Sequence, residues 1–135
     1  MTVSKKFIGA VVAAFVLITA FGYLLHGYLL AGTYADLPNL MRTADDGMRH
    51  MPYIFVGQFI TAVALVWIYE RGRQDKPWMG QGIRFGIVMA AFGPAAKFLI
   101  MWAVQQEPHQ LAIHQICGES LALLITSMVV ARIYA

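Results

Sequence analysis

Four long apolar runs, separated by short polar segments, constrain the fold of this chain more than any other feature of its sequence. The runs cover approximately residues 7–31, 52–69, 83–104 and 111–131. A helix needs roughly 20 residues to cross the hydrocarbon core of a bilayer. Lipid offers the backbone no hydrogen-bonding partners, so segments of this kind must be helical. The sequence predicts a single domain, residues 1–135, folded as an all-α, four-helix antiparallel transmembrane bundle.

The composition favours the same fold class. Apolar residues make up 59% of the 135 residues and charged residues 13%, against about 45–50% and 25% in soluble domains. A soluble chain this small exposes most of its surface and needs more charge to cover it. The net charge is +3, but the basic residues form no patch interleaved with aromatics, so nucleic acid is not expected as a partner. We expect the lipid bilayer as a partner, together with other membrane subunits or further copies of the chain.

The basic residues predict the orientation of the bundle. One side of the four runs carries most of them: Lys5, Lys6, Arg71, Arg73, Lys76, Arg84 and Arg132. The other side carries only Arg42 and Arg49, and acidic residues outnumber these two. Because loops rich in Lys and Arg stay in the cytoplasm, both termini are predicted to lie inside. The short loops around Lys76 and Pro108 also predict that the second, third and fourth helices are consecutive neighbours.

All four runs carry a polar or ionisable residue at a similar depth. Counting 1.5 Å per residue places His26, Gln58, Lys97 and Glu119 about 8–12 Å below the outer interface, with His114 shallower. A charge at this depth costs about 3 kcal/mol on insertion scales, so charged groups are expected to pair. We therefore predict an ion pair between Lys97 and Glu119, with the other three side chains as flanking ligand-binding groups. The alternative is that this layer only fixes the register of the helices.

The third run carries small residues on the helical face that leads to Lys97. Gly93, Ala90 and Gly86 precede Lys97 by 4, 7 and 11 residues, a spacing that directs Lys97 into the bundle in a regular helix. Small residues let helices approach closely, so Gly82, Gly86 and Ala90 are expected to pack against neighbouring helices or another subunit. Pro94 removes a backbone donor and predicts a kink beneath Lys97.

Histidines offer an alternative chemistry. His26 and His114 are candidate ligands for haem b or a transition metal in an electron-transfer protein, and His50 is a further candidate metal ligand. No H-E-x-x-H or C-x-x-C spacing supports a metal site. Each histidine also fits as a hydrogen-bonding residue near the interface, so the leading expectation is a protein without a cofactor.

The segment between the first two runs mixes apolar and charged residues. Residues 37–51 are predicted to form a short interfacial helix that caps the polar layer. Pro52 fits the first turn of the second membrane-spanning helix.

Several short patterns resemble those of small four-helix bacterial inner-membrane proteins of unassigned function. They are His26-Gly27-x-Leu-Leu, Met51-Pro52, Trp67-x-Tyr69 and Lys76-Pro77-Trp78-x-Gly80-Gln81-Gly82-x-Arg84-Phe85-Gly86. The resemblance covers nearly the whole chain. It implies a multi-pass protein of the bacterial inner (cytoplasmic) membrane and supplies no reaction, cofactor or partner.

No pattern in the sequence indicates an enzyme. Ser120 and Ser127 lack a His and an Asp at a suitable depth, and no Gly-rich phosphate-binding loop is present. We therefore predict a small non-enzymatic membrane protein. It is either an accessory or assembly subunit, or a binder of a small ligand at the polar layer near the outer side.

Overall fold

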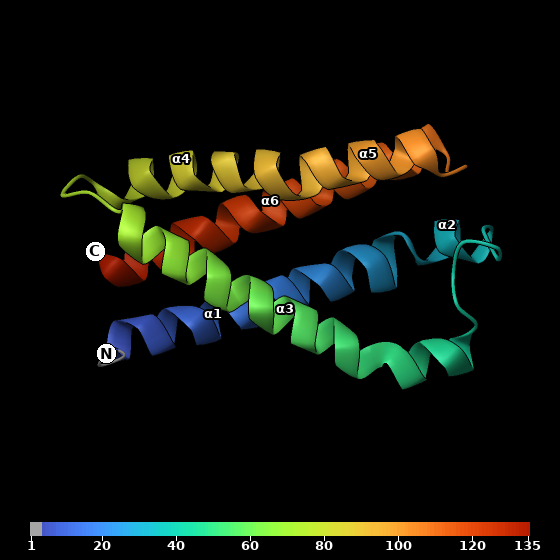
Figure 1. Cartoon of the computed structure of the whole chain (residues 1–135), viewed down its shortest axis with the longest axis horizontal. Helices are drawn as coiled ribbons and strands as arrows, with labels where there is room; N and C mark the ends of the chain where they lie inside the picture. Colours follow the sequence, from blue (N-terminus) through green and yellow to red (C-terminus); the bar gives the residue numbers. More distant parts are fainter. Residues whose placement is uncertain (1–3) are drawn as a thin grey trace.

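The computed structural model describes residues 4–135, and every regular element in that range is a helix (Figure 1). Four helical stretches are long and apolar enough to cross a membrane: Lys5–Leu29, Ala44–Gly72, Trp78–Val104 and His109–Tyr134. Each contains or nearly contains one predicted run. The elements in chain order are α1 (Lys5–Gly22), η1 (Tyr23–Leu29), α2 (Ala31–Ala35), α3 (Ala44–Gly72), α4 (Trp78–Ala90), η2 (Ala91–Ala95), α5 (Ala96–Val104) and α6 (His109–Tyr134).

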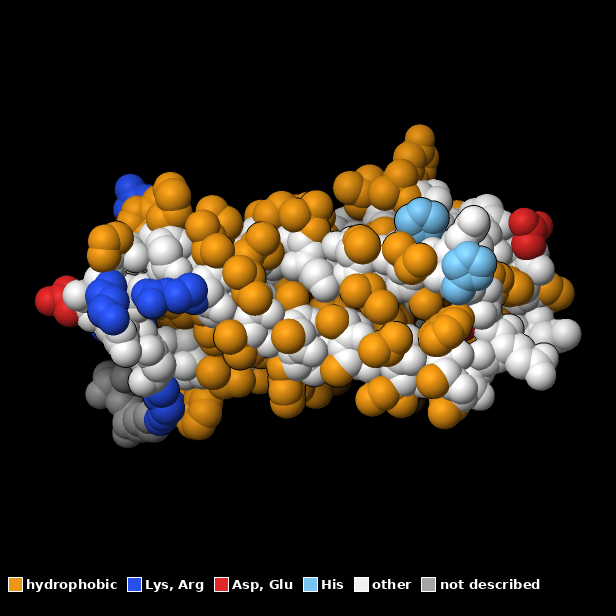
Figure 2. Space-filling view, turned by 90° about the horizontal axis from the view of Figure 1, so that it is seen from above, with side chains coloured by type: hydrophobic (Ala, Val, Ile, Leu, Met, Phe, Trp, Pro, Cys, Tyr) orange, Lys and Arg blue, Asp and Glu red, His pale blue; other side chains and the backbone are white. Residues whose placement is uncertain are grey.

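The long helices run between two ends of the molecule (Figure 1). Both chain termini and the loop of residues 73–77 lie at one end, which we call the termini end. The opposite, distal end carries α2, the segment 36–43 and the turn 105–108. The space-filling view shows Lys and Arg gathered at the termini end, hydrophobic side chains along the middle, and histidines toward the distal end (Figure 2). The basic residues that the sequence assigns to one side of the four runs therefore lie at one end of the molecule.

Helix α6 is the centre of the packing. It contacts α4 most extensively and then α1, while α3 packs mainly on α1. The predicted contact between the second and third helices is limited to the termini end, where Tyr69 of α3 packs on Phe85 of α4; beyond it α3 makes no extensive contact with α4 or α5 among residues 4–135. The physical reason is that glycines draw α4 onto α6, and the loop 73–77 leaves room for this. Figure 1 shows α3 diverging from α4 and α5 toward the distal end.

The buried core lies nearer the termini end. It brings together side chains of α1, α3 and α6: Ala10, Val11, Ala14, Ala62, Leu65, Val66, Tyr69, Val130, Ala131 and Tyr134. The ring of Tyr69 lies 5.2 Å from that of Phe85 and 5.7 Å from that of Tyr134, measured between centroids. Aromatic pairs at this separation add to the burial of apolar surface. The distal half of α3, in contrast, exposes almost every side chain from Met51 to Thr61.

Two glycines allow α4 to approach α6 at backbone distance. A Cβ atom added to Gly82 would lie 2.9 Å from the Cα of Met128, and one added to Gly86 would lie 2.9 Å from the Cα of Leu124. Both glycines are buried and Ala90 is partly buried. The prediction that these small residues face a neighbouring helix is confirmed, and that neighbour is α6.

Two π-helical turns interrupt the apolar helices. Pro94 lies in η2, because proline has no N–H to donate and its ring displaces the preceding turn. The sequence predicted a kink at Pro94, and the structure shows a π-helical turn there. The second π turn, η1, contains His26 and ends where the N–H of Leu30 donates to the carbonyl of Leu25, five residues back, at 2.8 Å.

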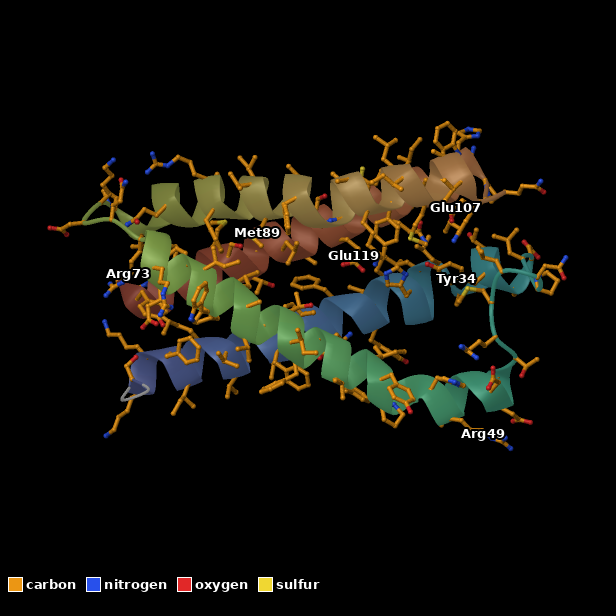
Figure 3. All side chains as sticks on the ribbon, in the orientation of Figure 1. Tyr34, Arg49, Arg73, Met89, Glu107 and Glu119 are labelled. Atoms are coloured by element: carbon orange, nitrogen blue, oxygen red, sulfur yellow. The ribbon has the colours of Figure 1, made fainter. Side chains whose placement is uncertain are left out.

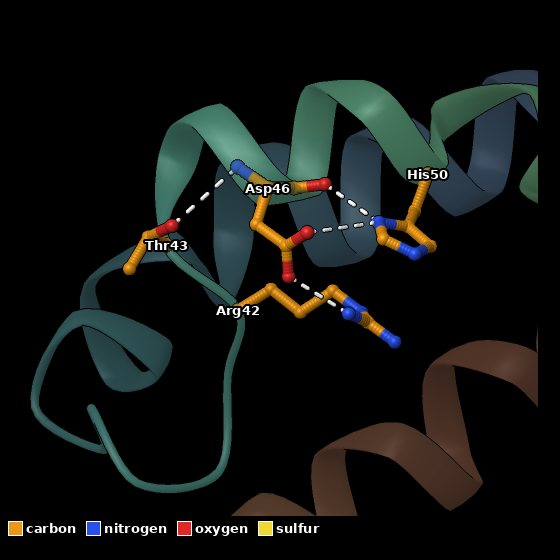
Figure 4. A network of polar contacts seen from close by, with 4 residues as sticks. All are labelled: Arg42, Thr43, Asp46 and His50. Carbon is orange, nitrogen blue, oxygen red and sulfur yellow. Dashed lines mark hydrogen bonds and ion pairs between the residues drawn. The ribbon is translucent and has the colours of Figure 1, made fainter.

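The predicted interfacial helix over residues 37–51 is wrong. Residues 44–51 form the first turns of α3, and the short helix α2 lies earlier in the chain. Thr43 caps α3 by accepting a hydrogen bond from the N–H of Asp46, whose carboxylate contacts Arg42 at 2.7 Å and His50 at 3.2 Å (Figure 4). This capping favours helix over a turn, so Pro52 lies well inside α3 instead of in its first turn.

Candidate functional site

Four polar side chains from three elements form a connected cluster in the distal half of the molecule. His26 Nε2 lies 2.6 Å from Glu119 Oε1, and His26 Nδ1 lies 2.6 Å from the hydroxyl oxygen of Tyr34. Gln115 Nε2 donates to the same hydroxyl at 3.1 Å. We call His26, Tyr34, Gln115 and Glu119 the His26 cluster; Figure 3 shows two of its members, Tyr34 and Glu119, together with Glu107.

Local structure explains how the cluster forms. The π turn η1 carries His26, and after the break at Leu30 the short helix α2 places the hydroxyl of Tyr34 against the ring of His26. Leu30 is buried and anchors this break. On α6, Gln115 and Glu119 are one turn apart and therefore share a face. π turns are frequent at functional sites because they change the direction of a side chain without ending the helix.

The hydrogen bonds of the cluster have a defined direction. The amide nitrogen of Gln115 can only donate, so the oxygen of Tyr34 accepts from it; when His26 is neutral and protonated on Nε2, the Tyr34 hydroxyl donates its own hydrogen to His26 Nδ1. A neutral His26 whose Nδ1 accepts must carry its hydrogen on Nε2 and donate it to Glu119. The chain of donors thus runs from Gln115 through Tyr34 and His26 to the carboxylate.

Two buried side-chain oxygens, those of Glu107 and Gln115, have no hydrogen-bond donor among residues 4–135. Glu107 and Gln115 are 7% and 5% exposed, and the oxygen concerned is Oε1 in each. Burial raises the pKa of the Tyr34 hydroxyl; the hydrogen bond from Gln115 opposes this rise, and the negative charges of Glu119 and Glu107 add to it. Tyr34 therefore keeps its proton and remains a donor, while the two free oxygens favour a further donor or a cation.

An open pocket lies at the distal end of the molecule, and no residue of the His26 cluster lines it. It measures about 410 Å³ and is lined by Asp36 to Leu40 together with Gln105 and Gln106. These residues are chain neighbours of Tyr34 and Glu107. Its lining includes one carboxylate, that of Asp36, and three amide side chains.

The structure separates the residues that the sequence placed in one layer. His26 and Glu119 lie together, whereas Gln58 accepts a hydrogen bond from Thr19 at 3.0 Å. His114 is exposed. Lys97 is also exposed, with its Nζ 4.7 Å from the ring centroid of Phe98.

The predicted ion pair between Lys97 and Glu119 is wrong. Within residues 4–135, Lys97 has no carboxylate within 4.0 Å, and Glu119 pairs with His26. The spacing argument assumed a regular α-helix through Pro94, but a π turn holds one extra residue and rotates the rest of the helix by about 100°. The same effect at η1 leaves Thr19 facing Gln58 on α3 and turns His26 toward α6.

The histidines proposed as metal ligands do not converge. In the part of the chain that the structure describes, no three or more His, Cys, Asp or Glu side chains are grouped for a metal ion. His50 contacts the carbonyl oxygen of Asp46 at 2.8 Å (Figure 4). Both ring nitrogens of His26 already have partners, so binding haem or a metal requires one of them to be released. A cofactor on His26 and His114 stays a prediction.

Sequence reasoning missed two members of the cluster. Tyr34 lies outside the apolar runs, in the short helix α2 that follows the break at Leu30, and this placement brings it to His26. Gln115 shares the α6 stripe with Glu119, and this spacing was the signal that could have identified it.

Fold and site together define an all-helical chain with four candidate membrane spans and a polar cluster among its helices. The chain matches no known protein family, no curated protein and no solved structure.

Proposed function

We propose that this chain is a small integral membrane protein that binds a small organic cation, such as a primary ammonium ion, at the His26 cluster. The proposal is carried by two buried oxygens that have no hydrogen-bond partner among residues 4–135: that of Gln115, which donates to Tyr34, and that of Glu107, whose charge acts on Tyr34. An ammonium ion has three donors and one positive charge, which match these oxygens and offset the charges of two nearby glutamates. The pocket at the distal end carries a further carboxylate, that of Asp36.

The cluster suits ligand binding better than a purely structural role. A structural network is most stable when every buried donor and acceptor has a partner, and partly satisfied networks cost stability. Here one end of the hydrogen-bonded chain is complete at Glu119, while the other end leaves two oxygens free. A bound cation would complete it and would stabilise the folded protein by mass action.

Thermal unfolding of the purified protein in detergent tests this proposal. Methylammonium and putrescine, compared with sodium at equal ionic strength, are expected to raise the unfolding midpoint in a concentration-dependent way. Saturation at one hundred times the dissociation constant adds about 2.7 kcal/mol of stability. Glu107→Gln and Glu119→Gln each remove a charge near the bound ion, so both variants are expected to lose most of the rise.

Asp45→Asn is the matched control, because Asp45 is an exposed acid at the same end of the molecule and lies outside the cluster. It should respond to methylammonium like the parent protein. An equal rise with sodium, or a rise that survives in both glutamate variants, would contradict a specific cation site.

We further propose that the four helices lie in a bacterial inner membrane as antiparallel spans, with the termini end in the cytoplasm. The charge asymmetry supports this orientation, because Lys and Arg gather at the termini end (Figure 2). The distal cluster would then open to the outer side. This is also the membrane that the resemblance of the sequence implies.

Labelling of single cysteines checks this orientation. Cys117 is the only cysteine of the chain, so a Cys117→Ser background accepts one new cysteine at either end. We expect an impermeant maleimide to label Asn39→Cys on intact spheroplasts and to label Asp75→Cys only after permeabilisation. Labelling of Asp75→Cys alone on intact spheroplasts would show the inverted orientation.

A further inference from the structure

A second pocket lies at the termini end, apart from the His26 cluster. It measures about 690 Å³ and is bounded by the loop 73–77, the start of α4 and the ends of α3 and α6. Aromatic side chains line it from three helices: Tyr69 of α3, Trp78 of α4 and Tyr134 of α6. Its cationic lining comes from Arg73 and Lys76 in the loop.

The wall that carries these cations is held in place by one side chain. The Oε1 atom of Gln81 accepts from the N–H of Gln74 at 2.7 Å, and its Nε2 atom donates to the carbonyls of Gln74 and Lys76 at 2.8 and 2.7 Å. Three hydrogen bonds from a residue of α4 thus fix the backbone of the loop. The pocket is therefore pre-organised, which lowers the entropic cost of binding a ligand there.

The charge of the pocket and its surroundings is positive. Arg73 lies with its guanidinium carbon 5.1 Å from the ring centroid of Tyr134, and Arg132 lies 5.7 Å from that of Trp78. Asp75 also lines the pocket and contributes one opposing carboxylate. Glu70 is nearby but accepts a hydrogen bond from Tyr134 at 3.2 Å. An anion with several oxygens, such as a phosphate group, fits two cations beside amide and phenol donors.

We propose that this pocket binds the phosphate headgroup of an anionic phospholipid. Two features favour a lipid over a free phosphate. First, the walls are tyrosine and tryptophan, which prefer the level of the headgroups in a bilayer. Second, Trp67, Ile68 and Met79 are close in sequence to the lining residues and expose apolar side chains, which acyl chains would contact. Basic pockets between helices on the cytoplasmic side are suited to such headgroups. The inference rests on the proposed membrane orientation and is independent of the cation site.

Quenching of Trp78 fluorescence by brominated lipids tests the inference on the full chain. Trp67→Phe and Trp102→Phe leave Trp78 as the single reporter, and the protein is reconstituted in phosphatidylcholine vesicles that contain brominated phosphatidylglycerol or brominated phosphatidylcholine. We expect phosphatidylglycerol to be enriched at Trp78 severalfold over phosphatidylcholine. Arg73→Gln and Lys76→Gln should each reduce the enrichment by about fivefold or to parity, as expected for one lost cation near the surface.

Arg84→Gln is the matched control, because Arg84 is exposed at the same end and does not line the pocket. It should keep the enrichment. Equal losses in all three variants would overturn the proposal in favour of general surface charge, and absence of any enrichment would overturn it outright. Displacement of the lipid by free glycerol phosphate would assign the pocket to a soluble anion instead. Failure of both brominated lipids to quench Trp78 would also overturn the proposal, because it would show that this end of the protein does not lie at the bilayer.

Discussion

Replacement of Gly86 by valine is expected to lower the free energy of unfolding by about 3 kcal/mol, because overpacking at a closed interface forces the backbone apart. The first added carbon would already lie 2.9 Å from the Cα of Leu124 and 2.8 Å from its Cδ1. A flexible side chain can move away from such a contact, but the backbone of α6 cannot. Helix α4 would have to move off α6, which removes the most extensive helix contact in the molecule.

Gly80→Val serves as the control for this substitution. Gly80 lies on the same helix, and an added Cβ there meets nothing within 4 Å. Valine at this position should change stability by a few tenths of a kcal/mol in the favourable direction, since glycine is a poor helix former. Unfolding in mixed micelles, followed by circular dichroism over a titration with sodium dodecyl sulfate, measures both variants. Equal losses at the two positions would contradict the packing of α4 on α6.

The helices and their close packing could be predicted because they depend on local properties of the sequence. Apolar runs of about 20 residues become helices wherever the backbone must satisfy itself. Gly82 and Gly86 are four residues apart, so they share a helical face whatever the partner is, and Pro94 distorts any helix that contains it. For these elements, residue type and spacing were sufficient, and the structure confirms the contact and shows a π-helical turn at Pro94.

The polar cluster could not be predicted in full because its geometry depends on departures from regular helices. Spacing rules assume about 100° of rotation for each residue. Each π turn changes the angular position around the helix axis of every residue that follows it. Lys97 comes after η2 and was therefore assigned to the wrong face, while Tyr34 reaches His26 only because the chain breaks at Leu30. Glu119 was predicted to pair with Lys97, but its partner in the structure is His26.

Substitutions of His26 and Lys97 distinguish the partner of Glu119 that spacing predicted, Lys97, from its partner in the structure, His26. His26→Ala is expected to lower the free energy of unfolding by about 2–3 kcal/mol, because it removes the hydrogen bond to Glu119 and the contact of the Tyr34 hydroxyl with Nδ1, although Gln115 still donates to Tyr34. Lys97→Met is expected to leave stability unchanged or to raise it slightly. Its ammonium group contacts only an aromatic ring, and methionine removes the cost of a charge within an apolar span.

Glu119→Gln separates the two pairings further, because an amide oxygen can still accept the hydrogen bond from Nε2 of His26. The loss for this variant should stay below about 1 kcal/mol, the net value of a typical hydrogen bond. If Glu119 were instead the counter-ion of Lys97, its conversion to glutamine would strand a buried cation, and Lys97→Met would strand a buried carboxylate. Both substitutions would then be costly, and His26→Ala would be mild. The order of the three stabilities therefore decides whether the partner of Glu119 is His26 or Lys97, and with it whether the polar groups of this bundle meet across η1 and α6 or across α5 and α6.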